Sequence, residues 1–134
     1  MLSTDDYLAV VNHIARYNHA IDLGTPEEWS ECFTDDAEFD AEPVVHCHGR
    51  AELLAFAKST LTPERLGRHW NTNILVDGAG DRATSRVYLL MVRGGKFGET
   101  GATGVYSDRL LKVDGQWRFE YRKLVFDDPP DWKG

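Results

Sequence analysis

The spacing of apolar residues changes about halfway along this 134-residue chain. Before residue 61, apolar side chains recur every three or four positions, which is typical of amphipathic helices. After residue 67 they alternate with polar ones, which is typical of strands with one buried face. A chain with helices first and a long run of strands after them is restricted to an α+β fold, in which the helices cover one face of a sheet.

Three helices are predicted before this change. The first covers residues 3–23, starts at a Ser or Thr cap and ends at Gly24. The second starts at Thr25, with Pro26 in its first turn, and is expected to include Cys32. The third covers residues 50–61. Between the last two, TDDAEFDA predicts a short strand and VVHCHG a loop.

Four strands are predicted after the helices, over residues 67–77, 81–93, 102–113 and 116–127. Their connections DGAGD, RGGKFGETG and DG are rich in turn-forming residues and short, which predicts an antiparallel meander. Strands of this length should curl around the helices and leave a cleft. The tail DDPPDWKG is expected to be irregular, and the whole chain, 1–134, to form a single domain.

Composition excludes several classes of function. The net charge of −7 and a pI near 5.1 argue against a nucleic-acid partner, which needs a basic face. No apolar run approaches the roughly 20 residues of a membrane span. MLSTDDYLAV lacks the basic start of a signal peptide, and two cysteines make no disulfide framework, so we expect a cytoplasmic protein without membrane contact.

The stretch RHWNTNILVDG places unusual side chains on a strand inside the predicted sheet. Alternation puts His69, Asn71, Asn73 and Leu75 on one face, and Trp70, Thr72, Ile74 and Val76 on the other. A histidine and two asparagines on one face indicate that this face is either in water or lines a pocket.

The next strand is apolar on both faces. Val87, Leu89 and Met91 alternate with Tyr88, Leu90 and Val92. Helices can cover only one side of the sheet, and a patch of this size is rarely left exposed on a monomer. We therefore predict a homo-oligomer, most simply a homodimer through the outer face of the sheet, with a trimer as the main alternative.

Several motifs resemble one known superfamily along nearly the whole chain. They are ARY and AIDLG in the first helix, W..CFTDDAEF, HGRAEL, RHWNTN and the closing DGQWRFEYRKL. Together they resemble the nuclear transport factor 2-like cone fold and, within it, the SnoaL-like enzymes. The resemblance implies three N-terminal helices packed on a curved antiparallel sheet. It is less specific for a reaction, because this fold hosts isomerases, dehydratases, cyclases and pure binding modules.

Three branches of the superfamily give different expectations. Tyr17 falls where ketosteroid isomerases carry an oxyanion donor, but their carboxylate base falls on Ala41. Asp22 and His69 fall on the dyad of hexachlorocyclohexane dehydrochlorinase and scytalone dehydratase, and Arg122 matches an arginine of their last strand. The small subunit of ring-hydroxylating dioxygenases shares the fold without catalytic residues, and is the non-enzymatic alternative.

The dehydrochlorinase-like branch implies a definite chemistry. His69 would take a proton from carbon, Asp22 would fix its tautomer and stabilise the imidazolium, and Tyr17 and Arg122 would stabilise a leaving group or oxyanion. The other expected ligand-binding residues are Asn71, Asn73, Trp29 and Phe39. The predicted function is that of a lyase or isomerase acting without a cofactor on a small, mostly apolar cyclic molecule. The alternative is a small-molecule-binding or subunit-type protein.

Other histidines are not assigned a function. The HCH motif at residues 46–48 could suggest a metal, but neighbouring residues in a loop seldom converge on one ion, so no metal site is predicted. His13 and His19 are expected on the solvated side of the first helix.

Overall fold

The structure, a computed structural model, describes residues 1–94 and 99–128. Its elements follow in the order α1 (Thr4–Leu23), α2 (Pro26–Ser30), β1 (Phe33–Ala41), β2 (Val45–His48), α3 (Arg50–Thr60), β3 (Arg68–Ala79), β4 (Arg82–Val92), β5 (Thr100–Val113) and β6 (Gln116–Phe126). The six strands form one sheet in the order β2-β1-β6-β5-β4-β3. Within the described residues, no helix is long and apolar enough to cross a membrane.

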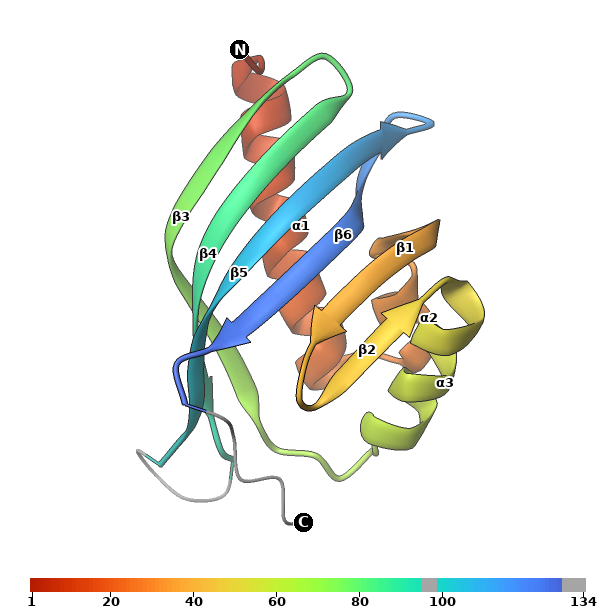
Figure 1. Ribbon diagram of the computed structural model, residues 1–134, viewed down its shortest axis with the longest axis vertical. Helices are drawn as coiled ribbons and strands as arrows, with labels where there is room; N and C mark the ends of the chain where they lie inside the picture. The colour runs from red at the N-terminus through yellow and green to blue at the C-terminus, as the bar shows by residue number, and fades with distance from the viewer. Residues whose placement is uncertain (95–98, 129–134) are drawn as a thin grey trace.

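The helices gather on one side of a curved sheet, as the α+β prediction requires. Figure 1 shows α1 crossing behind β4, β5 and β6, while α2 lies behind β1 and β2 and α3 lies beside the β2 edge. The cap residues act as expected, since the Ser3 hydroxyl accepts from the Asp6 N–H and the Thr25 hydroxyl from the Glu28 N–H. The α+β cone predicted from the sequence is confirmed.

The sheet differs from the prediction at its β1–β2 end. Residues 45–48 of the predicted loop form strand β2, which pairs with β1 through Phe39↔Cys47 and Ala41↔Val45. Strand β1 in turn runs parallel to β6, so the sheet is mixed and not purely antiparallel. A strand of four residues carries too little alternation to be recognised, and its pairing depends on a partner distant in sequence. Helix α2 also ends at Ser30, so Cys32 lies outside it.

The DG connection between β5 and β6 is the tight turn that the sequence predicts. Asp114 and Gly115 both have positive φ, 51° and 80°, which is the signature of a type I′ hairpin. The centre of the connection RGGKFGETG, residues 95–98, lies outside the described residues. Residues 129–134 of the tail also lie outside them.

A bulge in β3 changes which side chains face the core. The pairing of β3 with β4 shifts between Thr72 and Leu75, and Asn73 adopts the left-handed conformation at φ 54°. The extra residue reverses the alternation, so Leu75 is 70% exposed while Ile74 and Val76 pack against the core. The faces predicted for these positions were therefore wrong. Residues before the bulge keep their expected faces, with His69 inward and Trp70 outward.

His13 belongs to the core and not to the solvated side of α1. Its ring is 5% exposed, lies 5.0 Å from the Phe119 ring and places Nε2 2.9 Å from the carbonyl oxygen of Cys32. Burial lowers the pKa of His13 to about 4. The ring is therefore neutral at pH 7, with its Nε2–H donating to Cys32.

This buried histidine predicts acid sensitivity. In the unfolded chain His13 binds a proton below about pH 6.5, whereas in the folded chain it does so only below about pH 4. The free energy of unfolding therefore falls as the pH is lowered through this range. From pH 7 to pH 4.5 the His13 contribution should fall by about 2–3 kcal/mol. Urea unfolding at both pH values measures it. In His13→Gln, which keeps a donor but does not titrate, this part of the loss should disappear; an equal loss in both proteins would contradict the assignment.

Candidate active site

Helix α1 ends beside the start of β3, and this juxtaposition brings Asp22 to His69. An oxygen of the carboxylate, Oδ1, lies 2.6 Å from Nδ1 of the imidazole, and Oδ2 accepts the backbone N–H of His69 at 2.9 Å. Asp22 is 7% exposed and the His69 side chain 14%. The contact expected between the two side chains is present, whereas their catalytic role stays a prediction.

The contact fixes the protonation pattern of the ring. An ionised carboxylate can only accept, so Nδ1 of His69 carries the proton that it donates to Asp22. In the neutral ring, Nε2 then holds the lone pair, and no described residue hydrogen-bonds to it. A carboxylate in the last turn of a helix gains nothing from the helix dipole. The two donors from His69 are therefore what stabilises Asp22 at this position.

The dyad lies in the wall of a cavity of about 590 Å³ between the helices and the sheet. Most of the lining is apolar, including Phe39, Phe56, Leu89, Met91 and Phe126. Asp22, His69, Tyr17 and Tyr106 are among its few polar side chains. A mostly apolar cavity with a small number of polar groups is the usual form of a small-molecule site.

Tyr17 lies in the wall of this cavity at the centre of the aromatic core. The side chain is fully buried, and its hydroxyl has no hydrogen-bond partner among the described residues. Burial raises the pKa of the Tyr17 phenol well above its usual value. The group is therefore a neutral phenol, whose ring packs against those of Trp29 and Tyr106.

Arg122 lies behind the cavity wall and not in it. Its side chain is fully buried, and Nε lies 3.0 Å from Oδ1 of Asp108, which also accepts from Ser85 through its other oxygen. The guanidinium stacks on the Tyr17 and Tyr106 rings. Arg122 is not among the described residues that line the cavity, so the expected direct contact with a ligand is not supported.

Of the four residues expected to bind the ligand, the structure places only Phe39 in the cavity lining. Trp29 is fully buried among aromatic rings, and Asn73 is exposed at the bulge. Asn71 accepts from the Asn18 amide at 2.5 Å and donates to the Tyr88 carbonyl at 3.2 Å, which ties α1 to the sheet. These three side chains therefore lie outside the described cavity lining, and their expected role rested on strand parity or aromatic character alone.

Tyr106 is the polar cavity residue that sequence reasoning missed. It is 1% exposed and comes from β5, where every second residue from Ala102 to Leu110 is buried. That alternation was a usable signal, since it places a phenol on the inner face of the sheet. Arg65, from the segment between α3 and β3, also lines the cavity and was not anticipated.

Arg65 joins the segment after α3 to the end of α1, beside Asp22. Its Nε donates to the Ile21 carbonyl at 2.8 Å, Nη2 to the Gly24 carbonyl at 2.5 Å, and Nη1 to the Thr62 carbonyl at 2.8 Å. The last turn of α1 has no basic residue of its own. Arg65 therefore supplies donors to carbonyls at the helix end that otherwise lack partners.

Removing this side chain should destabilise the protein measurably. We expect Arg65→Ala to lower the free energy of unfolding by about 2 kcal/mol, because a charged donor to several carbonyls is lost. Arg65→Lys should recover only part of this, since one ammonium cannot reach three carbonyls on two segments. Urea unfolding measures the change. Arg68→Ala is the control, because this arginine is exposed and its side chain, among the described residues, bonds only to the adjacent Gly67 carbonyl. Equal effects of the two alanine variants would contradict the role of Arg65.

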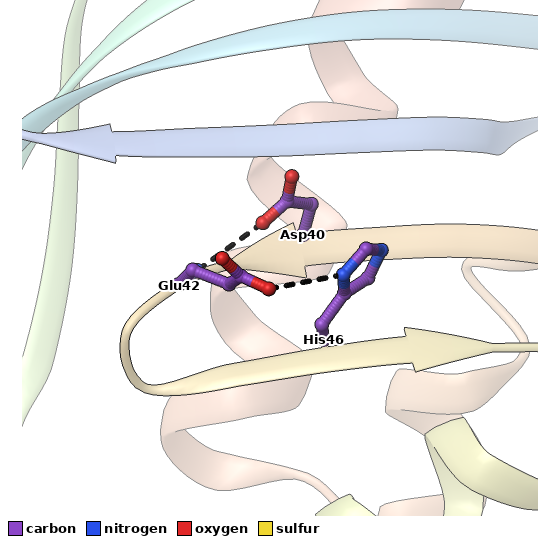
Figure 2. Close-up of side chains that lie close together, drawn as sticks. All are labelled: Asp40, Glu42 and His46. Atoms are coloured by element: carbon purple, nitrogen blue, oxygen red, sulfur yellow. Dashed lines mark hydrogen bonds and ion pairs between the residues drawn. The ribbon is translucent and has the colours of Figure 1, made fainter.

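The HCH motif lies on the β1–β2 hairpin, away from the dyad, and its side chains do not converge. Figure 2 shows His46 beside Glu42 and Asp40, whose possible ligand atoms all lie within 4.8 Å of one another. Both ring nitrogens of His46 face carboxylates, Nε2 at 2.5 Å from Glu38 and Nδ1 at 3.3 Å from Glu42, and Glu38 raises the pKa of His46. The arrangement is that of a protonated histidine held between carboxylates.

Helices packed on a curved sheet around one mostly apolar cavity are the architecture of the nuclear transport factor 2-like proteins. Residues 3–123 match the model of the SnoaL-like domain. The chain therefore belongs to the SnoaL-like family. No curated protein matches the sequence.

Solved structures share the fold. A variant of Rv3472 from Mycobacterium tuberculosis, a protein of unknown function, is 34% identical with a TM-score of 0.83 over 92% of this chain and 72% of its own. A candidate scytalone dehydratase from Novosphingobium aromaticivorans is 27% identical, with a TM-score of 0.80 over 92% and 85%. A cystatin-fold protein of unknown function from Nostoc punctiforme, 24% identical with a TM-score of 0.86 over 96% of each chain, shares the fold.

Proposed function

We propose that the protein is a lyase or isomerase that removes a proton from carbon in a small, mostly apolar cyclic molecule. The observation that carries the proposal is the Asp22–His69 contact in the wall of the apolar cavity. A histidine with one nitrogen held by a carboxylate and the other free is suited to general base chemistry near neutral pH. The likeness to a candidate scytalone dehydratase at 27% identity supports a reaction of this class.

The proposed step begins at Nε2 of His69, which takes a proton from a carbon atom. The electron pair of the broken C–H bond moves toward the neighbouring carbon. In an elimination it forms a double bond there and a leaving group departs with its own electron pair. In an isomerisation it is held as an enolate until the proton returns to a different carbon. In both cases Asp22 stabilises the imidazolium that forms in between.

The direct test is exchange of a carbon-bound proton with solvent. We expect the protein to accelerate deuterium incorporation into 2-tetralone, a cyclic ketone with acidic C–H groups, in D2O at pH 7, followed by NMR. Adding 2-naphthol, a non-reacting analogue of its enol, should inhibit the exchange. A rate equal to that of buffer, both for 2-tetralone and for a panel of cyclic ketones and halides that bind in the cavity, would refute the proposal and leave a binding protein.

A further inference from the structure

Arg65 brings a positive charge to the cavity that holds Asp22 and His69. It is the only arginine or lysine among the described residues that line this cavity, and its side chain is half-buried. Asp22 accepts two donors from His69, whereas Arg65 forms no ion pair with any described carboxylate. A cation that is partly removed from water is stabilised by an anion beside it. The cavity is therefore suited to a ligand that carries a negative charge.

The carbonyl groups around Arg65 do not use all of its donors. A guanidinium has five N–H groups. Nε donates to the Ile21 carbonyl and Nη1 to the Thr62 carbonyl, while Nη2 lies 2.5 Å from the Gly24 carbonyl oxygen and 3.5 Å from that of Ala20. Nη1 keeps a second N–H, for which the described residues provide no acceptor. Because carbonyls carry no net charge, the positive charge of the guanidinium also stays unbalanced.

Other polar groups of the cavity come from the same part of the chain as Arg65. Ser59 and Thr60, at the end of α3, both line the cavity, and their hydroxyl oxygens lie 3.4 Å apart. The chain then runs through Arg65 to the start of β3 (Figure 1). The lining that comes from β1, β2 and β6 is apolar, with Phe39 and Phe126 as examples. The cavity thus has one polar side and one apolar side.

The polar side also holds the proposed base, because Arg65 and His69 contact consecutive residues of α1. Nε of Arg65 lies 2.8 Å from the carbonyl oxygen of Ile21, and Nδ1 of His69 lies 2.6 Å from the carboxylate of Asp22. The Cα atoms of consecutive residues are only about 3.8 Å apart. Since both side chains line the cavity, one small molecule can reach both of them.

We propose that Arg65 binds a carboxylate group of the substrate, so that the substrate is a small cyclic carboxylic acid. The carboxylate accepts from Nη1 of Arg65, the ring lies among the apolar side chains, and the C–H group faces Nε2 of His69. Hydrogen bonds between a guanidinium and a carboxylate are stronger than those between neutral groups. The inference rests on the proposed function, since it names the substrate class of the same cavity.

The test compares two ligands of nearly equal shape, 2-naphthoate and its neutral isostere 2-naphthamide, by titration calorimetry at pH 7. We expect the unmodified protein to bind 2-naphthoate about tenfold or more tightly than 2-naphthamide. Arg65→Met keeps an apolar stem but removes the charge, so it should abolish this preference. Arg68→Ala is the matched control and should keep it, because Arg68 is exposed and is not among the described residues that line the cavity.

The ratio of the two dissociation constants separates ligand binding from folding. Arg65 also supports the end of α1, and a loosened cavity would weaken both ligands alike and leave their ratio unchanged. If Arg65→Met does not fold, Arg65→Lys decides, since its ammonium lacks the planar fork and should reduce the ratio.

An unmodified protein that does not prefer 2-naphthoate, or a folded Arg65 variant that keeps the full preference, would overturn the inference. Neither result depends on turnover. A preference for 2-naphthoate without proton exchange in any substrate would refute the proposed function alone. Proton exchange without this preference would refute the present inference alone.

Discussion

Replacing His69 by glutamine is expected to reduce the rate of proton exchange by about 10²–10⁴-fold, the range that a general base contributes. Glutamine can still occupy the space and donate toward Asp22, but it has no basic nitrogen. Asp22→Asn should have an effect of similar size for a different reason. The asparagine can still accept the backbone N–H of His69 through its carbonyl, while its amide would face Nδ1 and favour the tautomer with a proton on Nε2. The base would then be blocked without being removed.

Deuterium exchange of 2-tetralone, measured for each variant, tests this mechanism. His19→Gln and Asp5→Asn are matched controls, because both residues are exposed on α1 and neither is among the described residues that line the cavity. Binding of 2-naphthol should persist in the dyad variants, which separates a lost base from a lost cavity. If either dyad variant retained exchange within about threefold of the unmodified protein, His69 could not be the general base.

Most helices and strands could be predicted from the sequence because the patterns that indicate them are local. The Asp22–His69 dyad could be predicted because both residues fall on family positions. Helix caps, the DG turn and the alternation after residue 67 act over a few residues, and the structure confirms them. Asp22 and His69 were found because they fall on positions shared with a family, and not because any spacing linked them. No local pattern in a single sequence indicates a contact between residues that are 47 positions apart.

The remaining wall of the cavity could not be predicted, because its form depends on tertiary packing. A single bulge at Asn73 reverses the faces of the rest of β3, and no local pattern announces it. Arg122 was expected to contact a ligand although it shares its strand parity with Arg118 and Glu120; it is instead buried behind the cavity wall, where Asp108 from the adjacent strand neutralises it. Buried charges of this kind depend on a partner that only the fold supplies.

The outer face of the sheet leads to the second large prediction, which concerns assembly. Trp70, Tyr88 and Val125 are 58%, 51% and 55% exposed, and none of them faces the helices. The strand register places Thr72, Tyr88, Val105 and Val125 opposite one another across four strands, with Trp70 and Leu90 in the next row. The register thus groups exposed apolar side chains from neighbouring strands on one face, whereas a monomer usually exposes such side chains singly. We propose that a second copy of the chain covers it in a homodimer.

Trp70→Glu should dissociate such a dimer. In a two-fold interface each substitution occurs once on each chain, so Trp70→Glu would bury two unpaired carboxylates. We expect the dissociation constant of the dimer to rise by at least about 10²-fold. Light scattering on dilute protein should give twice the chain mass of 15.2 kDa for the unmodified protein and 15.2 kDa for the variant. Leu8→Glu is the matched control, since Leu8 is also 58% exposed but lies on α1.

The oligomeric state also bears on the candidate active site, because His69 and Trp70 lie on opposite faces of the same strand, β3. His69 points inward to the cavity while the adjacent Trp70 points outward, so one strand would carry both the base and the interface. Trp70→Glu should therefore yield a monomer that still binds 2-naphthol within a fewfold of the unmodified protein. A mass of 15.2 kDa for the unmodified protein would refute the dimer, and three times that mass would establish the trimer instead. Dissociation with complete loss of binding would mean that the partner supports the cavity, since β3 would then need the interface to hold His69 against Asp22.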